Sequence, residues 1–174
     1  MGIYKFYDTD STGFADYDIK GTAYNTLLET CFRYCSTVSM RIPSAQVVLP
    51  MAFERFRIPL TDNILYTYRH YYGDNFTQLQ KEVHLFTLAP SVREGIMNIT
   101  DSIFKWINGW GYQNPEDPAF YRKDGSIFFS SVIHEGECTL TPRQCENVND
   151  IISGGHWNHV DGKVSYQPPT SPQR

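Results

Sequence analysis

The stretch that decides the fold runs from residue 120 to residue 138 and reads FYRKDGSIFFSSVIHEGEC. Asp124 and Gly125 form a turn between two segments rich in aromatic and β-branched residues, which is the strongest local signal for a β-hairpin. The second segment, residues 127–133, is bulky on both alternating faces, with Phe128 on one and Phe129 on the other. This pattern is typical of a central strand that is covered on both sides. We therefore expect a sheet built around residues 127–133.

Outward from this hairpin, the changing period of the apolar residues predicts the other elements. Strands are expected at residues 3–7, 36–42, 64–72 and 81–88, with short edge strands or a loop at 44–60. Residues 75–82 also fit helical spacing, and a short helix there is the competing prediction. Helices are expected at 22–35, at 91–108 with Ser91 and Glu94 as a capping box, and at 141–152. The helix at 91–108 is expected to cover the central strand. Together these elements predict an α+β fold with about five to seven mostly antiparallel strands and about three helices.

The length of 174 residues and the distribution of proline predict one domain with a tail. Residues 1–162 are expected to form the single α+β domain. Residues 163–174 hold three prolines among Ser, Thr and Gln, a composition typical of a disordered segment.

Charge and hydropathy exclude several functional classes. The net charge is −4 and there is no basic run, which argues against nucleic-acid binding. There is no apolar stretch of about 18 residues, so no membrane association is expected. The N-terminus lacks the apolar core of a signal peptide. These features predict a cytoplasmic protein whose four cysteines are thiols.

The N-terminal strand is followed by an acidic loop that suggests a hydrolase. Asp8-Thr9-Asp10-Ser11-Thr12 after residues 3–7 resembles the strand and DxDx[TV] loop of haloacid-dehalogenase-type phosphatases. The resemblance implies that Asp8 is a nucleophile, Asp10 a general acid and magnesium the cofactor. It covers about ten residues, and the rest of the chain does not alternate strand and helix as a doubly wound fold does.

A second enzymatic alternative lies at the end of the central strand, where His134 and Glu135 are a titratable pair suited to acid/base catalysis. Neighbouring residues on a strand point to opposite faces, so these two side chains come together only if the strand has already ended. Gly136 makes such an ending plausible. A small hydrolase acting through Asp8 and Asp10, or through His134 and Glu135, is therefore the alternative function.

A metal site drawn from His134, Cys138, His156 and His159 has suitable ligand types for zinc. Their spacing does not match a zinc knuckle, and no histidine follows His134-Glu135 at the position that a zincin requires. We expect no metal and no cofactor.

Aromatic residues of the kind found at protein interfaces are abundant, with 12 Tyr and 3 Trp. The predicted binding residues are these aromatics together with two carboxylates at the end of the central strand: Tyr68, Tyr71, Tyr72, Trp110, Tyr112, Tyr121, Trp157, Glu135 and Glu137. We expect a non-enzymatic domain that binds another protein, and the type of protein that fits is an immunity or antitoxin inhibitor that caps a basic toxin or enzyme.

Overall fold

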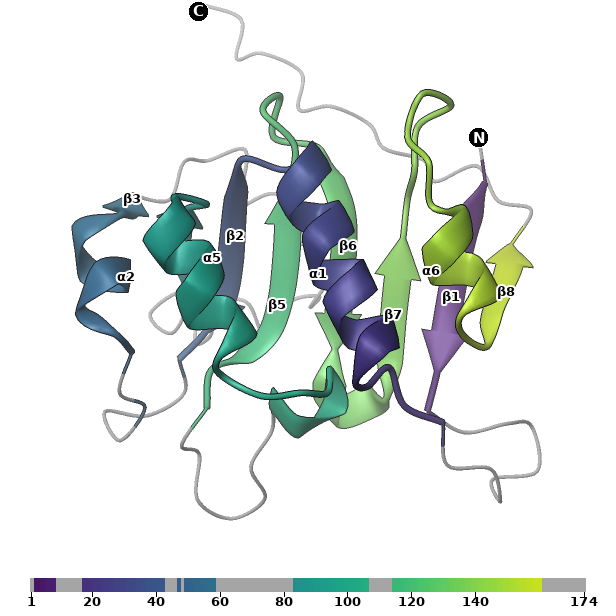
Figure 1. Ribbon diagram of the computed structural model, residues 1–174, viewed down its shortest axis with the longest axis horizontal. Coiled ribbons are helices and arrows are strands. Elements are labelled where there is room, and N and C mark those ends of the chain that lie inside the picture. Colours follow the sequence, from purple (N-terminus) through teal and green to yellow (C-terminus); the bar gives the residue numbers. More distant parts are fainter. Residues whose placement is uncertain are drawn as a thin grey trace, which may run out of the picture.

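The computed structural model describes residues 2–8, 17–42, 47, 49–58, 83–106 and 114–160. In these residues one sheet holds eight strands in the order β3-β4-β2-β5-β6-β7-β1-β8, and all neighbouring strands are antiparallel (Figure 1). The strands are β1 (Ile3–Tyr7), β2 (Thr37–Arg41), β3 (Arg57–Ile58), β4 (Val83–Thr87), β5 (Glu116–Tyr121), β6 (Ile127–Val132), β7 (Glu137–Leu140) and β8 (Trp157–Val160).

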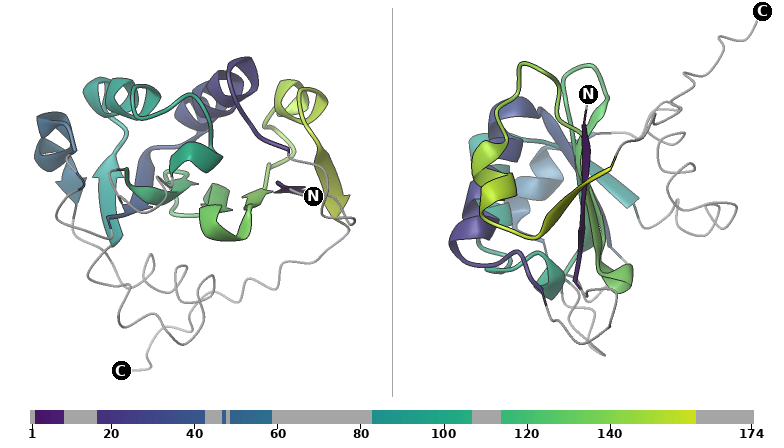
Figure 2. Two further views of the ribbon diagram at one scale, coloured as in Figure 1. Left: turned by 90° about the horizontal axis from the view of Figure 1, so that it is seen from below. Right: turned by 90° about the vertical axis from the view of Figure 1, so that its right-hand side faces the viewer.

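Within the described ranges, four α-helices lie on one face of this sheet (Figure 2). They are α1 (Thr22–Tyr34), α2 (Met51–Arg55), α5 (Pro90–Met97) and α6 (Asn149–Ser153). The 3₁₀ turns η2 (Phe104–Trp106) and η4 (Ile133–Glu135) lie at one end of the sheet. The predicted α+β fold is confirmed, with slightly more strands than expected. No helix in the described ranges is long and apolar enough to cross a membrane.

The predicted hairpin is present as β5 and β6, and β6 lies in the interior of the sheet. Gly125 has a φ of 81°, and the Asp124 carboxylate accepts the Ser126 amide at 3.1 Å, so the turn residues serve as expected. The expected strict alternation is wrong. A register shift between Phe120 and Tyr121 inserts an extra residue in β6, which lets Phe128 and Phe129 both pack in the helix-side core.

Helix α1 has the predicted extent and buries Leu27, Leu28 and Cys31. It packs against β6, so α1 covers the central strand, and the prediction that helix 91–108 does so is wrong. The predicted helix from Ser91 to Asn108 ends at Met97, and Ala89 caps it without a capping box.

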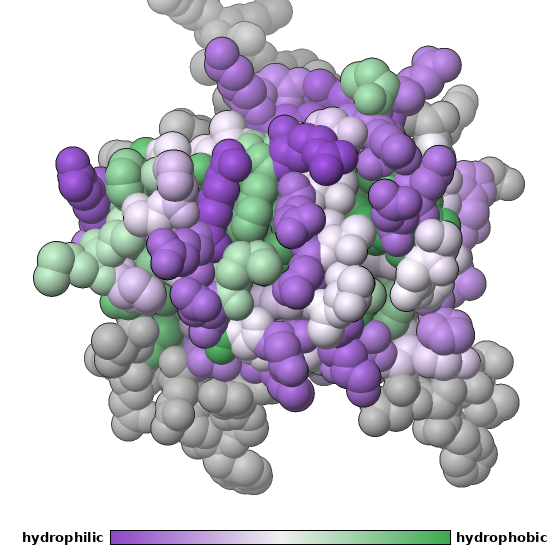
Figure 3. Space-filling view, in the orientation of Figure 1, coloured by the Kyte–Doolittle hydropathy of each residue, from purple (hydrophilic) through white to green (hydrophobic). Residues whose placement is uncertain are grey.

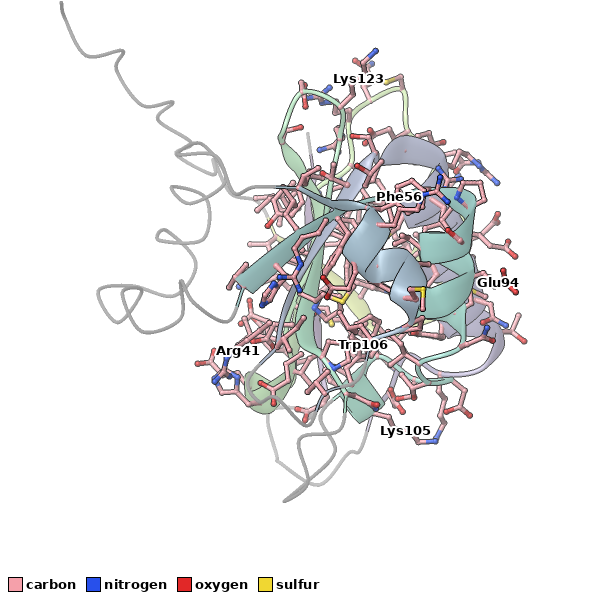
Figure 4. The ribbon with its side chains drawn as sticks, turned by 90° about the vertical axis from the view of Figure 1, so that its left-hand side faces the viewer. Arg41, Phe56, Glu94, Lys105, Trp106 and Lys123 are labelled. Carbon is pink, nitrogen blue, oxygen red and sulfur yellow. The ribbon has the colours of Figure 1, made fainter. Side chains whose placement is uncertain are left out.

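The chain after α5 pairs with the segment before α1 instead of continuing as a helix. Gly21 donates its amide to the Asp101 carbonyl at 2.8 Å, Ile103 donates to the Ile19 carbonyl at 3.0 Å, and Ser102 forms an isolated bridge with Lys20. The Asp101 carbonyl and the Ile103 amide are therefore not available for the hydrogen bonds of a helix over residues 91–108. Trp106 then points into the core (Figure 4), where its indole donates to the buried Tyr24 hydroxyl at 3.0 Å.

The predicted helix over residues 141–152 shortens to α6 for a similar reason. Arg122 extends from the end of β5 and donates to the Thr141 carbonyl at 2.6 Å and to both oxygens of Glu146, each at 2.6 Å. Residues 141–146 therefore wrap around a guanidinium that is 6% exposed. The predicted strand at 64–72, the competing helix at 75–82 and the tail at 163–174 lie outside the described residues.

Two apolar clusters lie on opposite faces of the sheet. The larger fills the space between the sheet and the helices and includes Phe6, Leu28, Phe86, Phe120 and Trp106. The smaller, on the other face, contains Val83, Leu85, Ala119 and Tyr121. The helix-side surface carries mostly hydrophilic side chains (Figure 3), so it offers no large apolar patch to a partner.

Neighbouring serines on β6 offer a matched test of buried hydrogen bonding. Ser131 is 1% exposed and donates its hydroxyl to the Pro118 carbonyl at 3.0 Å, whereas Ser130 is 3% exposed and its hydroxyl has no partner within the described chain. We expect Ser131→Ala to lower the free energy of unfolding by about 1–2 kcal/mol. Ser130→Ala should be neutral or slightly stabilising, because it removes a buried unpaired hydroxyl. Urea unfolding of the two variants measures the difference, and equal losses would contradict the assignment.

His84 on β4 provides a pH-dependent contribution to stability. Its burial, and secondarily the charge of Arg57, lower the pKa of the imidazole below its ordinary value of 6.5, although Glu54 opposes this. The folded protein thus favours neutral His84, and the unfolded chain binds more protons as the pH falls below 6.5. The contribution of neutral His84 to the free energy of unfolding is fully present above pH 6.5. It is lost as the pH falls towards the lower pKa of His84 in the folded protein.

We therefore expect wild type to lose more stability than His84→Gln between about pH 7 and pH 5. Urea unfolding at a series of pH values measures this. Asn25→Gln, at an exposed position of α1, is the control and should leave the wild-type slope unchanged. Parallel curves for wild type and His84→Gln would rule out the proposed role of His84.

Candidate functional site

Four of the predicted residues come together where β1, η4 and β7 meet at one end of the sheet. We call Asp8, His134, Glu135 and Glu137 the acidic rim. Tyr7 at the end of β1 pairs with Glu137 at the start of β7, and Asp8 donates its amide to the Gly136 carbonyl at 2.8 Å. Residues nearly 130 positions apart in the sequence therefore form one local structure.

Gly136 is what allows Asp8 to lie so close to η4. Its φ of 64° is in the left-handed region, and a Cβ added there would lie 2.1 Å from the Asp8 carboxylate carbon. The Asp8 carbonyl also accepts the Tyr17 amide at 2.6 Å. The Asp8 backbone is thus held from two sides, and its carboxylate lies directly against Gly136.

His134 and Glu135 share this end because β6 ends at Val132. The two residues lie in η4, where their side chains are 50% and 64% exposed and the His134 Nε2 is 3.8 Å from the Glu135 Oε1. The sequence required the strand to end before His134 and Glu135 if their side chains were to come together, and it does. The separation exceeds a hydrogen bond, so the histidine is not fixed by the carboxylate.

Glu137 differs from the other two carboxylates because it is already paired. The Lys5 ammonium donates to Glu137 and lies 5.8 Å from the centroid of the Tyr7 ring. Partial burial alone would lower the pKa of Lys5, but the hydrogen bond and charge of Glu137 outweigh it and raise the pKa. Lys5 therefore neutralises Glu137.

Asp8 and Glu135 have no such partner. In the described part of the chain neither of them pairs with a lysine or arginine. Arg41 lies at the same end (Figure 4), but its guanidinium donates to Glu116 at 2.8 Å. The unpaired negative charge of the rim therefore belongs to partly exposed Asp8 and exposed Glu135.

Asp117 is a buried residue that holds η4, and with it His134 and Glu135, in place. It is 1% exposed, has a φ of 50°, and accepts the Ile133 amide at 2.7 Å, which fixes the start of η4. Sequence reasoning missed Asp117 and Lys5 as parts of the site, because their contacts depend on long-range pairing. It used Gly136 only as a sign that the strand ends there.

Cys138 is a core residue and does not belong to the exposed site. Its side chain is 0% exposed on the helix side of β7, and burial, followed by the charges of Glu137, Asp117, Asp18 and Asp8, raises the pKa of the thiol well above its usual value. A thiol held protonated in the core is a poor nucleophile at neutral pH.

The other members of the alternative metal set lie apart. His156 stacks on Tyr17 with ring centroids 3.9 Å apart, and His159 lies 5.2 Å from Tyr4. Over the described ranges no three His, Cys, Asp or Glu side chains are arranged to hold a metal ion. The set of His134, Cys138, His156 and His159 is therefore not brought together.

The predicted aromatic anchors divide into three groups. Tyr121 is 1% exposed and its hydroxyl lies 2.9 Å from the Ser39 hydroxyl in the smaller apolar cluster, so its prediction as a surface anchor is corrected. Trp157 is half-buried against Phe6, with centroids 5.5 Å apart. The others lie outside the described residues, as does Asp10: Tyr68, Tyr71, Tyr72, Trp110 and Tyr112.

Comparison with known proteins identifies no relative of this chain. Neither a family model, nor a curated protein, nor a solved structure matches this chain. The geometry of the acidic rim is the remaining guide to function.

Proposed function

We propose that this chain is a non-enzymatic binding domain that recognises a basic protein through its acidic rim. The observation that carries the proposal is the pair of carboxylates of partly exposed Asp8 and exposed Glu135, which no lysine or arginine neutralises in the described chain. Cationic side chains of a partner can pair with these carboxylates without first breaking an internal ion pair.

The global charge supports the same kind of partner. The net charge of −4 adds long-range attraction towards a basic surface, and such attraction raises association rates. Trp157, which is partly exposed on β8, is an aromatic of the type enriched at interfaces. The proposed activity needs no cofactor.

Among such domains, the immunity or antitoxin type fits best. These are small, acidic proteins that cap a toxin or enzyme in the cytoplasm, and the size, charge and rim of this chain suit that role. The inference is an analogy of type, because similar folds serve many functions.

Affinity capture tests the proposal. The immobilised chain should capture a stoichiometric basic protein from a lysate of its native source. The double variant Asp8→Asn/Glu135→Gln should capture much less. A matched double variant, Glu29→Gln/Glu94→Gln, removes the same charge from exposed positions on α1 and α5 and should capture as much as wild type. Equal capture by all three proteins, or no stoichiometric partner, would count against the proposal.

A small hydrolase is the second candidate, because the structure brings His134 and Glu135 to the same end of the sheet as Asp8. In this alternative His134 acts as acid or base beside a carboxylate. A phosphatase and esterase screen of the purified protein, with and without magnesium, distinguishes the two functions. Turnover that is lost in His134→Gln or Asp8→Asn, but kept in Glu29→Gln, would favour the enzyme.

A further inference from the structure

Strand β8 forms one lateral edge of the sheet in the described chain (Figures 1 and 2). All four of its residues pair with β1, in a continuous antiparallel register without a shift. The strand contains no Asp, Glu, Lys, Arg or Pro. Edge strands that stay unpaired usually carry a charge, a proline or a bulge that blocks further pairing, and β8 has none of these features.

The opposite edge is protected. Strand β3 has only two residues, and one of them, Arg57, is charged and bonded to Glu54 at 2.7 Å. A short, charged strand is a poor template for another strand. The two edges of the same sheet therefore differ in their capacity to accept a partner, and β8 is the receptive one.

We propose that β8 pairs with β8 of a second copy of this chain, so that two sheets join across a twofold axis. Identical strands meet in antiparallel orientation across such an axis, and opposed residues must lie on the same face of the sheet. A register centred on Asn158 meets this requirement. It places Asn158 opposite Asn158 of the second copy, and Trp157 opposite His159 of the second copy.

The side chains of β8 suit this register. Trp157 packs on Phe6 and His159 lies against Tyr4, so both belong to the same face, while Asn158 alternates with them and pairs with Lys5. In this register the central residue faces its own copy, and the residues beside it face each other across the axis. Like charges on the strand would therefore come into opposition, which destabilises a sheet. The lack of formal charges in β8 removes that obstacle to pairing with itself.

The interface is small, because each copy contributes a four-residue strand. Stable dimers usually bury more than about 1,000 Å² in total, so the association should be weak and should depend on protein concentration. This pairing is independent of the function proposed for the acidic rim.

Sedimentation equilibrium of the purified chain tests the proposal. The average mass should rise above that of the monomer as wild-type protein is concentrated. Asn158→Lys alone and Asn158→Asp alone should each stay monomeric, because identical charges then face each other at the twofold axis. An equimolar mixture of the two should associate again, since lysine now faces aspartate. Asn25→Lys and Asn25→Asp, at an exposed position of α1, should behave as wild type.

Hydrogen exchange on wild-type protein gives a measurement that needs no substitution. Backbone amides of β8 should gain protection as the concentration rises, while those at the start of α5 should not. A wild-type chain that stays monomeric at the highest concentration would overturn the proposal. So would Asn158 variants that associate as wild type does, or a mixture that fails to restore association.

Discussion

Glu146→Gln is expected to lower the free energy of unfolding by about 3–5 kcal/mol, which is the usual cost of breaking a buried ion pair from one side. The side chains of Arg122 and Glu146 are 7% and 6% exposed, and two bonds of 2.6 Å join them. Glu146 also accepts the Arg143 amide at 2.7 Å. Loss of its charge leaves the Arg122 guanidinium buried without a compensating anion.

A nearby exposed ion pair is the control for this prediction. Arg143 pairs with Asp124 at side chains that are 39% and 52% exposed. Asp124→Asn should therefore cost only about 0–1 kcal/mol from the ion pair. The double variant Arg122→Met/Glu146→Met should recover much of the stability lost in Glu146→Gln, because no charge is then buried. Urea unfolding compares all three variants. Similar losses for Glu146→Gln and Asp124→Asn would show that the Arg122 pair is not buried as described.

Gly136→Ala should cost about 2–5 kcal/mol, because the substitution adds two penalties. A side chain at a φ of 64° costs about 1–2 kcal/mol, and the new Cβ overlaps the Asp8 carboxylate, which adds about 1–3 kcal/mol. Gly21→Ala is the matched control. Gly21 has a φ of 55° with nothing within 4 Å of an added Cβ, so only the backbone cost applies.

A double variant isolates the contact between the two parts of the rim. Asp8→Ala removes the carboxylate that the new Cβ would meet, so Asp8→Ala/Gly136→Ala should be more stable than the sum of the single changes predicts. Thermal or urea unfolding of the four proteins completes the cycle. Strictly additive effects would mean that Asp8 does not lie against Gly136 in solution.

Local sequence signals predicted the elements that depend on local interactions. The Asp124-Gly125 turn and the apolar stripe of α1 are such signals, and both elements appear where they were expected. The helix expected at 91–108 failed because its second half bonds to residues 19–21, far away in the sequence. Rules for helix capping and periodicity consider only neighbouring residues, so they cannot predict that bonds to residues 19–21 replace the helical ones. The helix expected at 141–152 failed because Arg122 draws residues 141–146 into a loop.

The same distinction applies to the candidate site. The sequence singled out Asp8, His134, Glu135 and Glu137 one by one, from an acidic loop and from a strand end. Their convergence follows from the pairing of β1 with β7, which no local pattern predicts. Tyr121 was placed at the surface because tyrosines are common there, yet the smaller apolar cluster buries it.

The dissociation constant of the complex with the captured partner tests the role of the acidic rim most directly. Titration calorimetry should show that Asp8→Asn/Glu135→Gln binds about tenfold or more weakly than wild type, with a smaller dependence on salt, since two unpaired charges are lost. Glu29→Gln/Glu94→Gln should bind as wild type does. Equal dissociation constants for the rim variant and wild type, across low and high salt, would contradict recognition through Asp8 and Glu135.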